Sequence, residues 1–197
     1  MTMRRSTLAL LAPLAALSLS ACGVNSVPTA EENAKAKWAN VQADYQRRAD
    51  LIPNLVETVK GFAKQEKDVL VQVTEARAKA TSVQVSGADL TDPAKVAAFQ
   101  QAQSQLSGSI GRLLASVEAY PDLKSNANFL ALQSQLEGTE NRINVSTKDY
   151  NEAVQAYNTT IRTFPDAIGA KIFYGAKPME TFKATAPNAD RAPTVKF

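Results

Sequence analysis

Apolar side chains recur every three or four positions over three long stretches of this chain, and polar side chains fill the positions between them. This spacing gathers the apolar side chains on one face of a helix. The first stretch covers residues 30–83, with its apolar stripe running from Ala34 to Ala80. The stripe keeps its phase across Pro53, where proline removes one helix hydrogen bond. We therefore predict over 30–83 one long helix kinked at Pro53, or two helices end to end, with Thr29 as the N-cap.

The second stretch is bounded by residue types that start and stop helices. Residues 82–91 break the apolar pattern, and Asp92 and Pro93 then provide a capping side chain and a first-turn proline. Apolar positions follow at steps of three and four until Tyr120, and Pro121 comes next. The pattern predicts a second helix that begins at Asp92 and ends before Pro121.

The third stretch runs from about residue 123 to 164 and stops at Pro165. A helix of this length would span about 60 Å at 1.5 Å per residue. The link around Pro121 is short, so the second and third helices are predicted to be antiparallel neighbours. The fold class that follows is all-α: an antiparallel, four-helix-bundle-like domain over residues 31–183.

The C-terminal part has a different pattern. Residues 168–174 carry a short apolar patch, predicted to form a last short helix, whose members are Ile168, Ile172, Phe173 and Tyr174. The patch either closes the end of the bundle or contacts a membrane or a partner, and Lys171 and Lys177 flank it as expected at an anionic interface. The remaining prolines predict an extended tail over residues 184–197.

The N-terminal residues have the features of a secreted lipoprotein. Residues 1–21 combine a basic start with a short apolar run, which indicates a signal peptide. The run ends in Leu19-Ser20-Ala21-Cys22, which resembles the bacterial lipobox. This resemblance implies that Cys22 carries a diacylglycerol and an N-acyl chain, and that residues 22–30 form a lipidated tether. Gly23 follows Cys22, and by resemblance to Gram-negative sorting signals this favours the periplasmic face of the outer membrane.

Composition narrows the chemistry. The chain has one Cys and no His, so it lacks an internal disulfide and the commonest general base and metal ligand. Removing residues 1–21 takes away Arg4 and Arg5 and leaves 20 basic and 19 acidic residues, because 22 minus 2 is 20. We therefore predict no catalytic residues, no metal, no cofactor beyond the lipid on Cys22, and no nucleic-acid partner.

Several ordered motifs resemble those of the LemA family. They are RRADLIPNLVETVKGF at 47–62, EAYPDLK at 118–124, NF at 128–129, LEGTENRI at 136–143, DYN at 149–151, YN at 157–158 and FP at 164–165. The resemblance covers about residues 35–197 and implies an antiparallel helical bundle tethered to a membrane, without an established activity. Two features depart from the family: residues 146–148 read Ser-Thr-Lys instead of a basic pair, and a lipobox replaces the usual transmembrane helix.

The densest polar cluster lies around Pro53 and comprises Arg47, Arg48, Asp50, Asn54 and Glu57. It is a candidate docking surface for a partner. The structural alternative is that Arg48 pairs with Asp44 four residues earlier, while Asn54 caps backbone groups freed by Pro53. On the third helix, Glu137, Glu140 and Arg142 share one stretch, and without His we expect a solvated face or interhelical ion pairs there instead of a metal site.

These observations favour a non-enzymatic scaffold or adaptor, held at the membrane by lipid and binding an unidentified membrane or envelope protein. The alternative is a self-associating coat or membrane-shaping protein that acts through the C-terminal patch.

Overall fold

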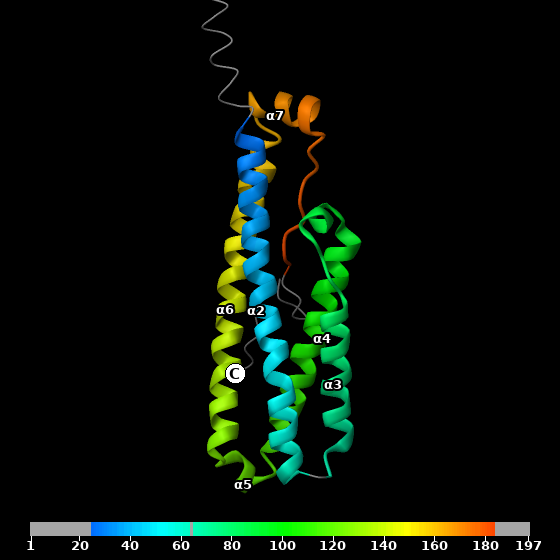
Figure 1. Ribbon diagram of the computed structural model, residues 1–197, viewed down its shortest axis with the longest axis vertical. Helices are drawn as coiled ribbons and strands as arrows, with labels where there is room; N and C mark the ends of the chain where they lie inside the picture. Colours follow the sequence, from blue (N-terminus) through cyan, green and yellow to red (C-terminus); the bar gives the residue numbers. More distant parts are fainter. Residues whose placement is uncertain (1–24, 64, 184–197) are drawn as a thin grey trace, which may run out of the picture.

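The computed structural model describes residues 25–63 and 65–183, and in these ranges the chain is all-α, as predicted (Figure 1). Four long helices form an up-down-up-down bundle: α2 (Ser26–Phe62), α3 (Lys67–Ser82), α4 (Pro93–Val117) and α6 (Ala127–Thr160). The shorter elements are η1 (Gly87–Thr91), α5 (Pro121–Lys124), α7 (Asp166–Gly169) and η2 (Ala170–Tyr174). No described helix contains an apolar stretch long enough to cross a bilayer.

The prediction for the first stretch was wrong about where the chain changes direction. α2 runs as a helix through the exposed Pro53 and ends at Phe62, and α3 then returns antiparallel to it (Figure 1). The apolar stripes of both helices face one core, since Leu55 of α2 and Val73 of α3 are buried in the same apolar cluster. Periodicity alone does not distinguish one long helix from two helices folded onto one core.

α2 also begins earlier than predicted, at Ser26 with Asn25 in the N-cap position, so Thr29 is not the cap. The Thr29 hydroxyl donates to the Asn25 carbonyl oxygen at 2.7 Å within the first turn. Pro28 is tolerated there because first-turn N–H groups have no partner inside the helix. The predicted tether over 22–30 is therefore partly helical. Cys22 and the signal peptide lie outside the described residues.

Polar side chains cap the starts of α4 and α6. The Asp92 side chain accepts hydrogen bonds from the amides of Ala94 and Lys95, which confirms the predicted start of α4. The third predicted helix is interrupted by a second cap: Asn126 accepts from the amides of Asn128 and Phe129, and α6 begins there. α5 is thereby separated from α6.

The bundle core consists of two apolar clusters with a polar layer between them. The cluster nearer the start of α2 contains Trp38, Phe99 and Tyr150, and the other contains Ile52, Leu106 and Leu136. α2 packs mainly on α6, and α3 on α4. The predicted antiparallel arrangement of α4 and α6 is confirmed, and the two helices face each other across a groove lined by side chains of both.

The predicted short C-terminal helix is present as α7 and η2, which lie across the end of the bundle where α2 begins (Figure 1). Gly175, with φ of 54°, ends this helix in the left-handed region and sends the chain back along the bundle. Residues 175–183 then run extended beside the helices (Figure 1). The predicted tail over 184–197 lies outside the described residues.

Candidate functional site

Arg48 forms the centre of the polar layer. Its side chain is 1% exposed, and its guanidinium reaches two other helices. Nη1 donates to the hydroxyl of Ser107 at 2.6 Å and to the carboxylate of Glu140 at 2.8 Å, from α4 and α6 respectively. Nη2 donates to the backbone oxygen and the side-chain oxygen of Gln103, at 3.2 Å and 2.8 Å. One side chain of α2 therefore ties α2, α4 and α6 together.

Gln103 extends this network to the fourth long helix. Its side-chain amide nitrogen donates to the backbone oxygen of Ala80 in α3 at 3.1 Å. The Arg48 guanidinium also lies 5.0 Å from the centre of the Tyr45 ring. Burial raises the pKa of the Tyr45 hydroxyl above its ordinary value, and the positive charge of Arg48 opposes that rise. The layer thus aligns all four long helices at one level.

The network leaves one donor of Arg48 unused. Its Nε is buried and has no hydrogen-bond partner among the described residues. An unpaired buried donor costs about 1–3 kcal/mol. The carboxylate of Glu140 balances the charge of the buried guanidinium. Its side chain is 44% exposed and lines the groove.

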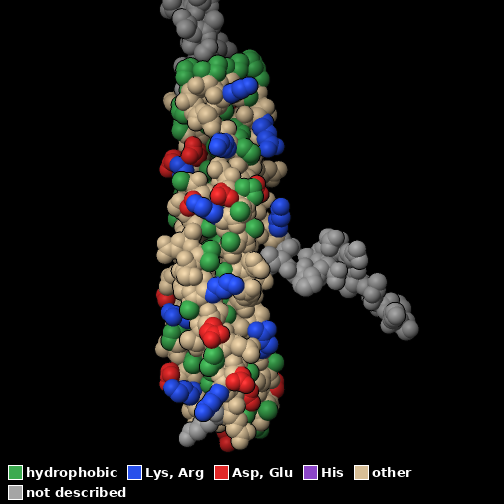
Figure 2. Space-filling view, turned by 90° about the vertical axis from the view of Figure 1, so that its right-hand side faces the viewer, with side chains coloured by type: hydrophobic (Ala, Val, Ile, Leu, Met, Phe, Trp, Pro, Cys, Tyr) green, Lys and Arg blue, Asp and Glu red, His purple; other side chains and the backbone are tan. Residues whose placement is uncertain are grey.

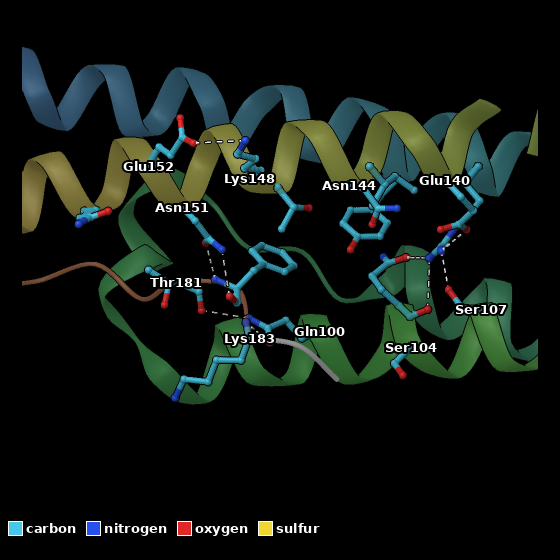
Figure 3. Close-up of a pocket in the computed structure, with 17 residues that line it drawn as sticks. Gln100, Ser104, Ser107, Glu140, Asn144, Lys148, Asn151, Glu152, Thr181 and Lys183 are labelled. Carbon is cyan, nitrogen blue, oxygen red and sulfur yellow. Dashed lines mark hydrogen bonds and ion pairs between the residues drawn. The ribbon is translucent and has the colours of Figure 1, made fainter. Parts of the chain in front are cut away.

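The groove between α4 and α6 has a volume of about 800 Å³, and α2 lies beside it with Tyr45 and Arg48 in its lining. Asn144 of α6 lines it, between Asn151 and Glu140 (Figure 3). Ser104 and Ser107 line it from α4. The groove is polar where it meets Arg48.

Residues 175–183 form an extended segment, and its last three residues line the other end of the groove. Asn158 and Asn151 each bind one residue of this segment through both backbone groups. Asn158 donates to the Met179 oxygen and accepts from its amide, both at 2.9 Å. Asn151 does the same with Phe182, at 3.1 Å and 2.8 Å. Each asparagine thus replaces the pairing that a neighbouring strand would provide.

Other groups bind the same segment. The hydroxyls of Tyr157 and Tyr150 donate to the backbone oxygens of Lys177 and Glu180. From the α4 side, Gln100 makes longer contacts, 3.4 Å to the Thr181 oxygen and 3.5 Å from the Lys183 amide (Figure 3). The bundle therefore holds an extended peptide from both walls of the groove.

The aromatic cluster receives the side chain of Phe182. The ring centre of Phe182 lies 5.6 Å from that of Trp38, and it also contacts the rings of Tyr45, Phe99 and Tyr150. Met179 is 4% exposed. Both residues bound by asparagine therefore direct apolar side chains into the core.

The structure divides the polar cluster predicted around Pro53. Arg48 points into the bundle, so it is not part of a docking surface, and it pairs with Glu140 instead of Asp44. Arg47, Asp50, Asn54 and Glu57 are exposed on α2, and their role in docking stays a prediction.

Glu57 lies at an apolar groove of about 750 Å³ between α2 and α3, which is also lined by Leu70 and Val71. The expected interhelical ion pair on the third helix is confirmed for Glu140, whereas Glu137 accepts from Gln133 on its own helix. The described residues contain no group of three acidic, His or Cys side chains placed to hold a metal ion.

The side chains of the C-terminal patch are largely exposed, although the short helix that carries them lies across the end of the bundle. Ile168, Ile172, Phe173 and Tyr174 are exposed by 52%, 69%, 68% and 42%, and Phe164 beside them by 82%. We call these five residues the apolar cap. The cap covers the end of the bundle where α2 begins, and the Ser26 hydroxyl there donates to Asp166 at 2.6 Å. Hydrophobic side chains accordingly gather at that end of the molecule (Figure 2).

Asn151 and Asn158 belong to motifs noted in the sequence, but no role for them follows from the sequence alone. The available indication is their spacing, since asparagine recurs at 144, 151 and 158, every seven residues. Their partner segment carries no pattern that predicts a docked strand.

The sequence is similar to a family model and to several known proteins. The LemA family model matches residues 37–197. Protein LemA of Metamycoplasma hominis is 27% identical over 124 residues, covering 63% of this chain and 52% of that protein. Magnetosome protein MamQ 2 of Paramagnetospirillum magneticum is 27% identical over 157 residues. Magnetosome protein MamQ of Magnetospirillum gryphiswaldense is 26% identical over 157 residues. Each of these two alignments covers 72% of this chain and 58% of the relative. The chain thus aligns with just over half the length of these relatives. Since the family model covers most of its length, the chain belongs to the LemA family.

Proposed function

We propose that this chain is a lipid-anchored, non-enzymatic adaptor of the cell envelope, which rests its apolar cap on the membrane and presents its opposite end to a membrane or envelope protein. The observation that carries the proposal is the position of the cap. It covers the end of the bundle where α2 begins, and Ser26 follows the proposed lipid-bearing Cys22 by four positions. Lipid and cap would therefore meet the same surface. Family membership supports a membrane-associated protein.

The cap has the composition of a membrane contact. Complete burial of one large apolar side chain contributes about 1.5–3 kcal/mol. Three of the five cap residues, Phe164, Ile172 and Phe173, are more than two-thirds exposed. Lys171 and Lys177 are exposed next to them, as anionic headgroups would favour. A cap of this kind supplements a lipid anchor, because stable anchoring usually takes two signals. In a Gram-negative cell, Gly23 favours the periplasmic face of the outer membrane.

The far half of the bundle offers the adaptor surface. Asp50, Asn54 and Glu57 are exposed on α2, and the apolar groove between α2 and α3 adjoins Glu57. Val71, which lines that groove, is 53% exposed. An apolar groove with a charged rim suits a protein partner. The adaptor would then hold a partner at a distance from the membrane set by the bundle length.

The exposed cap also favours a second candidate, a self-associating coat that shapes the lipid surface. The same cap residues would then contact lipid, while the sides of neighbouring bundles contact one another. The two functions differ in what lies against α2 and α3: another protein for the adaptor, and a second copy of this chain for the coat.

Photo-crosslinking in living cells separates these functions. A photo-reactive residue replaces Glu57 in the full lipidated chain, and a matched chain carries it at Arg142, exposed on α6. The adaptor predicts one recurring membrane or envelope protein crosslinked from position 57, not from 142, and lost in a Cys22→Ser chain. Crosslinks to a second copy of the chain alone would overturn the adaptor in favour of the coat. Equal products from both positions would overturn a docking surface at Glu57.

A further inference from the structure

The C-terminal segment is held through its backbone. Six hydrogen bonds join α6 to residues 177–182, and each uses a backbone group of the segment. The side chains of α6 that make them are those of Tyr150, Asn151, Tyr157 and Asn158. On the other side, the Glu180 amide donates to the Leu90 oxygen at 2.9 Å. Since backbone groups recur at almost every residue, these bonds select an extended conformation and not a sequence.

Two side chains of the segment supply its apolar contacts. Met179 is 4% exposed, and Phe182 packs against four aromatic rings. They are three residues apart, and the same two residues are the ones bound by asparagines of α6. Glu180 and Thr181 between them are only partly buried. The site therefore requires of its occupant two apolar residues, at positions i and i+3 of an extended chain.

The walls of this site belong to helices that pack on one another directly. The rings that surround Phe182 come from α2, α4 and α6, and α2 packs along α6. They are the rings of Trp38, Tyr45, Phe99 and Tyr150. The segment is joined to the preceding helix by Gly175, and its residues Lys177 and Pro178 are exposed. It is thus an addition to the surface of a packed bundle.

We propose that this groove is a binding site for an extended peptide of a partner protein, with apolar residues at i and i+3. The chain's own residues 176–183 occupy the site until such a peptide displaces them. The attached segment competes at an effective concentration on the order of millimolar, so it is displaced only by a partner present at high local concentration. The inference does not rest on the proposed function, because this site is separate from the surface between α2 and α3.

A synthetic peptide with the sequence of residues 176–183, AKPMETFK, is the probe. The receptor is the full chain carrying Cys22→Ser and Phe182→Ser, whose own segment lacks one apolar contact and competes less. Calorimetric titration should show saturable binding, and a peptide with Ser in place of Phe should bind at least about tenfold more weakly. A peptide with Ser at the two positions between Met and Phe should bind within about threefold of the probe, because those side chains lie outside the apolar cluster.

Two further variants of the receptor locate the bound peptide. Asn151→Ala should weaken binding about tenfold, since two hydrogen bonds to the peptide backbone are lost. Asn141→Ala is the matched control and should leave the affinity unchanged, because this exposed residue of α6 lines a different surface with Asn40 and Asp44. The chain with its own Phe182 should bind the probe more weakly than the receptor does.

Three titration results would overturn the proposal. The first is a receptor that does not bind the probe. The second is equal affinity with and without Asn151→Ala, which would place the peptide elsewhere. The third is binding of the probe without binding of the peptide that has Ser between Met and Phe, which would restrict the site to a second copy of this chain.

Circular dichroism checks that the receptor is folded. If Phe182→Ser lowers the helix content, Met179→Ser replaces it in the receptor, and the peptide with Ser in place of Met becomes the weak binder. Loss of helix content in both variants would show that the bundle requires its own segment to fold, and would also overturn the proposal.

Discussion

Arg48 Nη1 and Glu140 Oε1 lie 2.8 Å apart, which joins the middle of α2 to α6 across 92 positions of sequence. The pair lies between the two apolar clusters of the core, so it helps to set the register of α2 against α6 at that level. Buried polar pairs are known to fix the register of packed helices. The polar layer around Arg48 is therefore as much a part of the fold as the clusters it separates.

Replacing Arg48 by Met should lower the free energy of unfolding by about 3 kcal/mol, because a buried partner of a charged pair is removed. Gln103 and Ser107 lose their donor at the same time. Glu140→Gln should cost about 1 kcal/mol, since it keeps an acceptor and the side chain is partly exposed. Urea unfolding measures both, with Arg142→Met as the exposed control. If Arg48→Met changes the free energy of unfolding by less than about 0.5 kcal/mol, the hydrogen bonds and charges of the layer do not stabilise the fold.

Asn151→Ala should release the C-terminal segment. The variant loses two hydrogen bonds to Phe182, worth about 0.5–1.5 kcal/mol each. Trp38 reports the release, because it is the one tryptophan of the chain and its ring lies 5.6 Å from that of Phe182. Its fluorescence should shift as Phe182 leaves. Asn141→Ala should leave the spectrum unchanged, and an unchanged spectrum for Asn151→Ala would contradict the role given to Asn151.

Asp89 should make the loop before α4 sensitive to acid. A hydrogen bond from Lys95, together with bonds from Ser86, lowers the pKa of Asp89 from 3.8 to about 2. A lowered pKa stabilises the fold above the unfolded value, and this stabilisation is lost as the pH falls from about 4 towards 2. Asp89→Asn should therefore be less stable than the parent at pH 7, and the difference should shrink below pH 4. Thermal melts across this range test it, and a difference that does not change with pH would contradict it.

The apolar cap should bind membranes without contributing to stability. Ile172→Ser with Phe173→Ser should leave the free energy of unfolding within about 0.5 kcal/mol, because both side chains are mostly exposed. Binding of the Cys22→Ser chain to anionic vesicles should fall at least about tenfold, as two apolar contacts are lost. Val145→Ser is the control, since Val145 is 62% exposed on α6 away from the cap. Equal vesicle binding by the parent and the double variant would remove the cap from the membrane contact.

Local patterns were sufficient for much of the fold. The spacing of apolar residues identified the long helices, and Asp92 with Pro93 identified the start of α4, because caps and amphipathic faces depend on residues close in sequence. The same patterns did not reveal the reversal between α2 and α3, because each helix shows the apolar stripe of a continuous helix and both stripes are buried in one cluster. They did reveal the apolar patch over 168–174, but not whether it would be buried.

The candidate site depended on contacts between distant residues. Arg48 looks in the sequence like one member of an exposed charged cluster, and its burial follows from Ser107, Gln103 and Glu140, which lie 55 to 92 positions away. Asn151 and Asn158 look like ordinary polar residues until the segment over 175–183 lies against them. Hydrophobic periodicity is a property of each helix, so the sequence determines the helices. A buried charge or a bound backbone is satisfied by whichever groups the packing brings near, so the packed bundle determines the site.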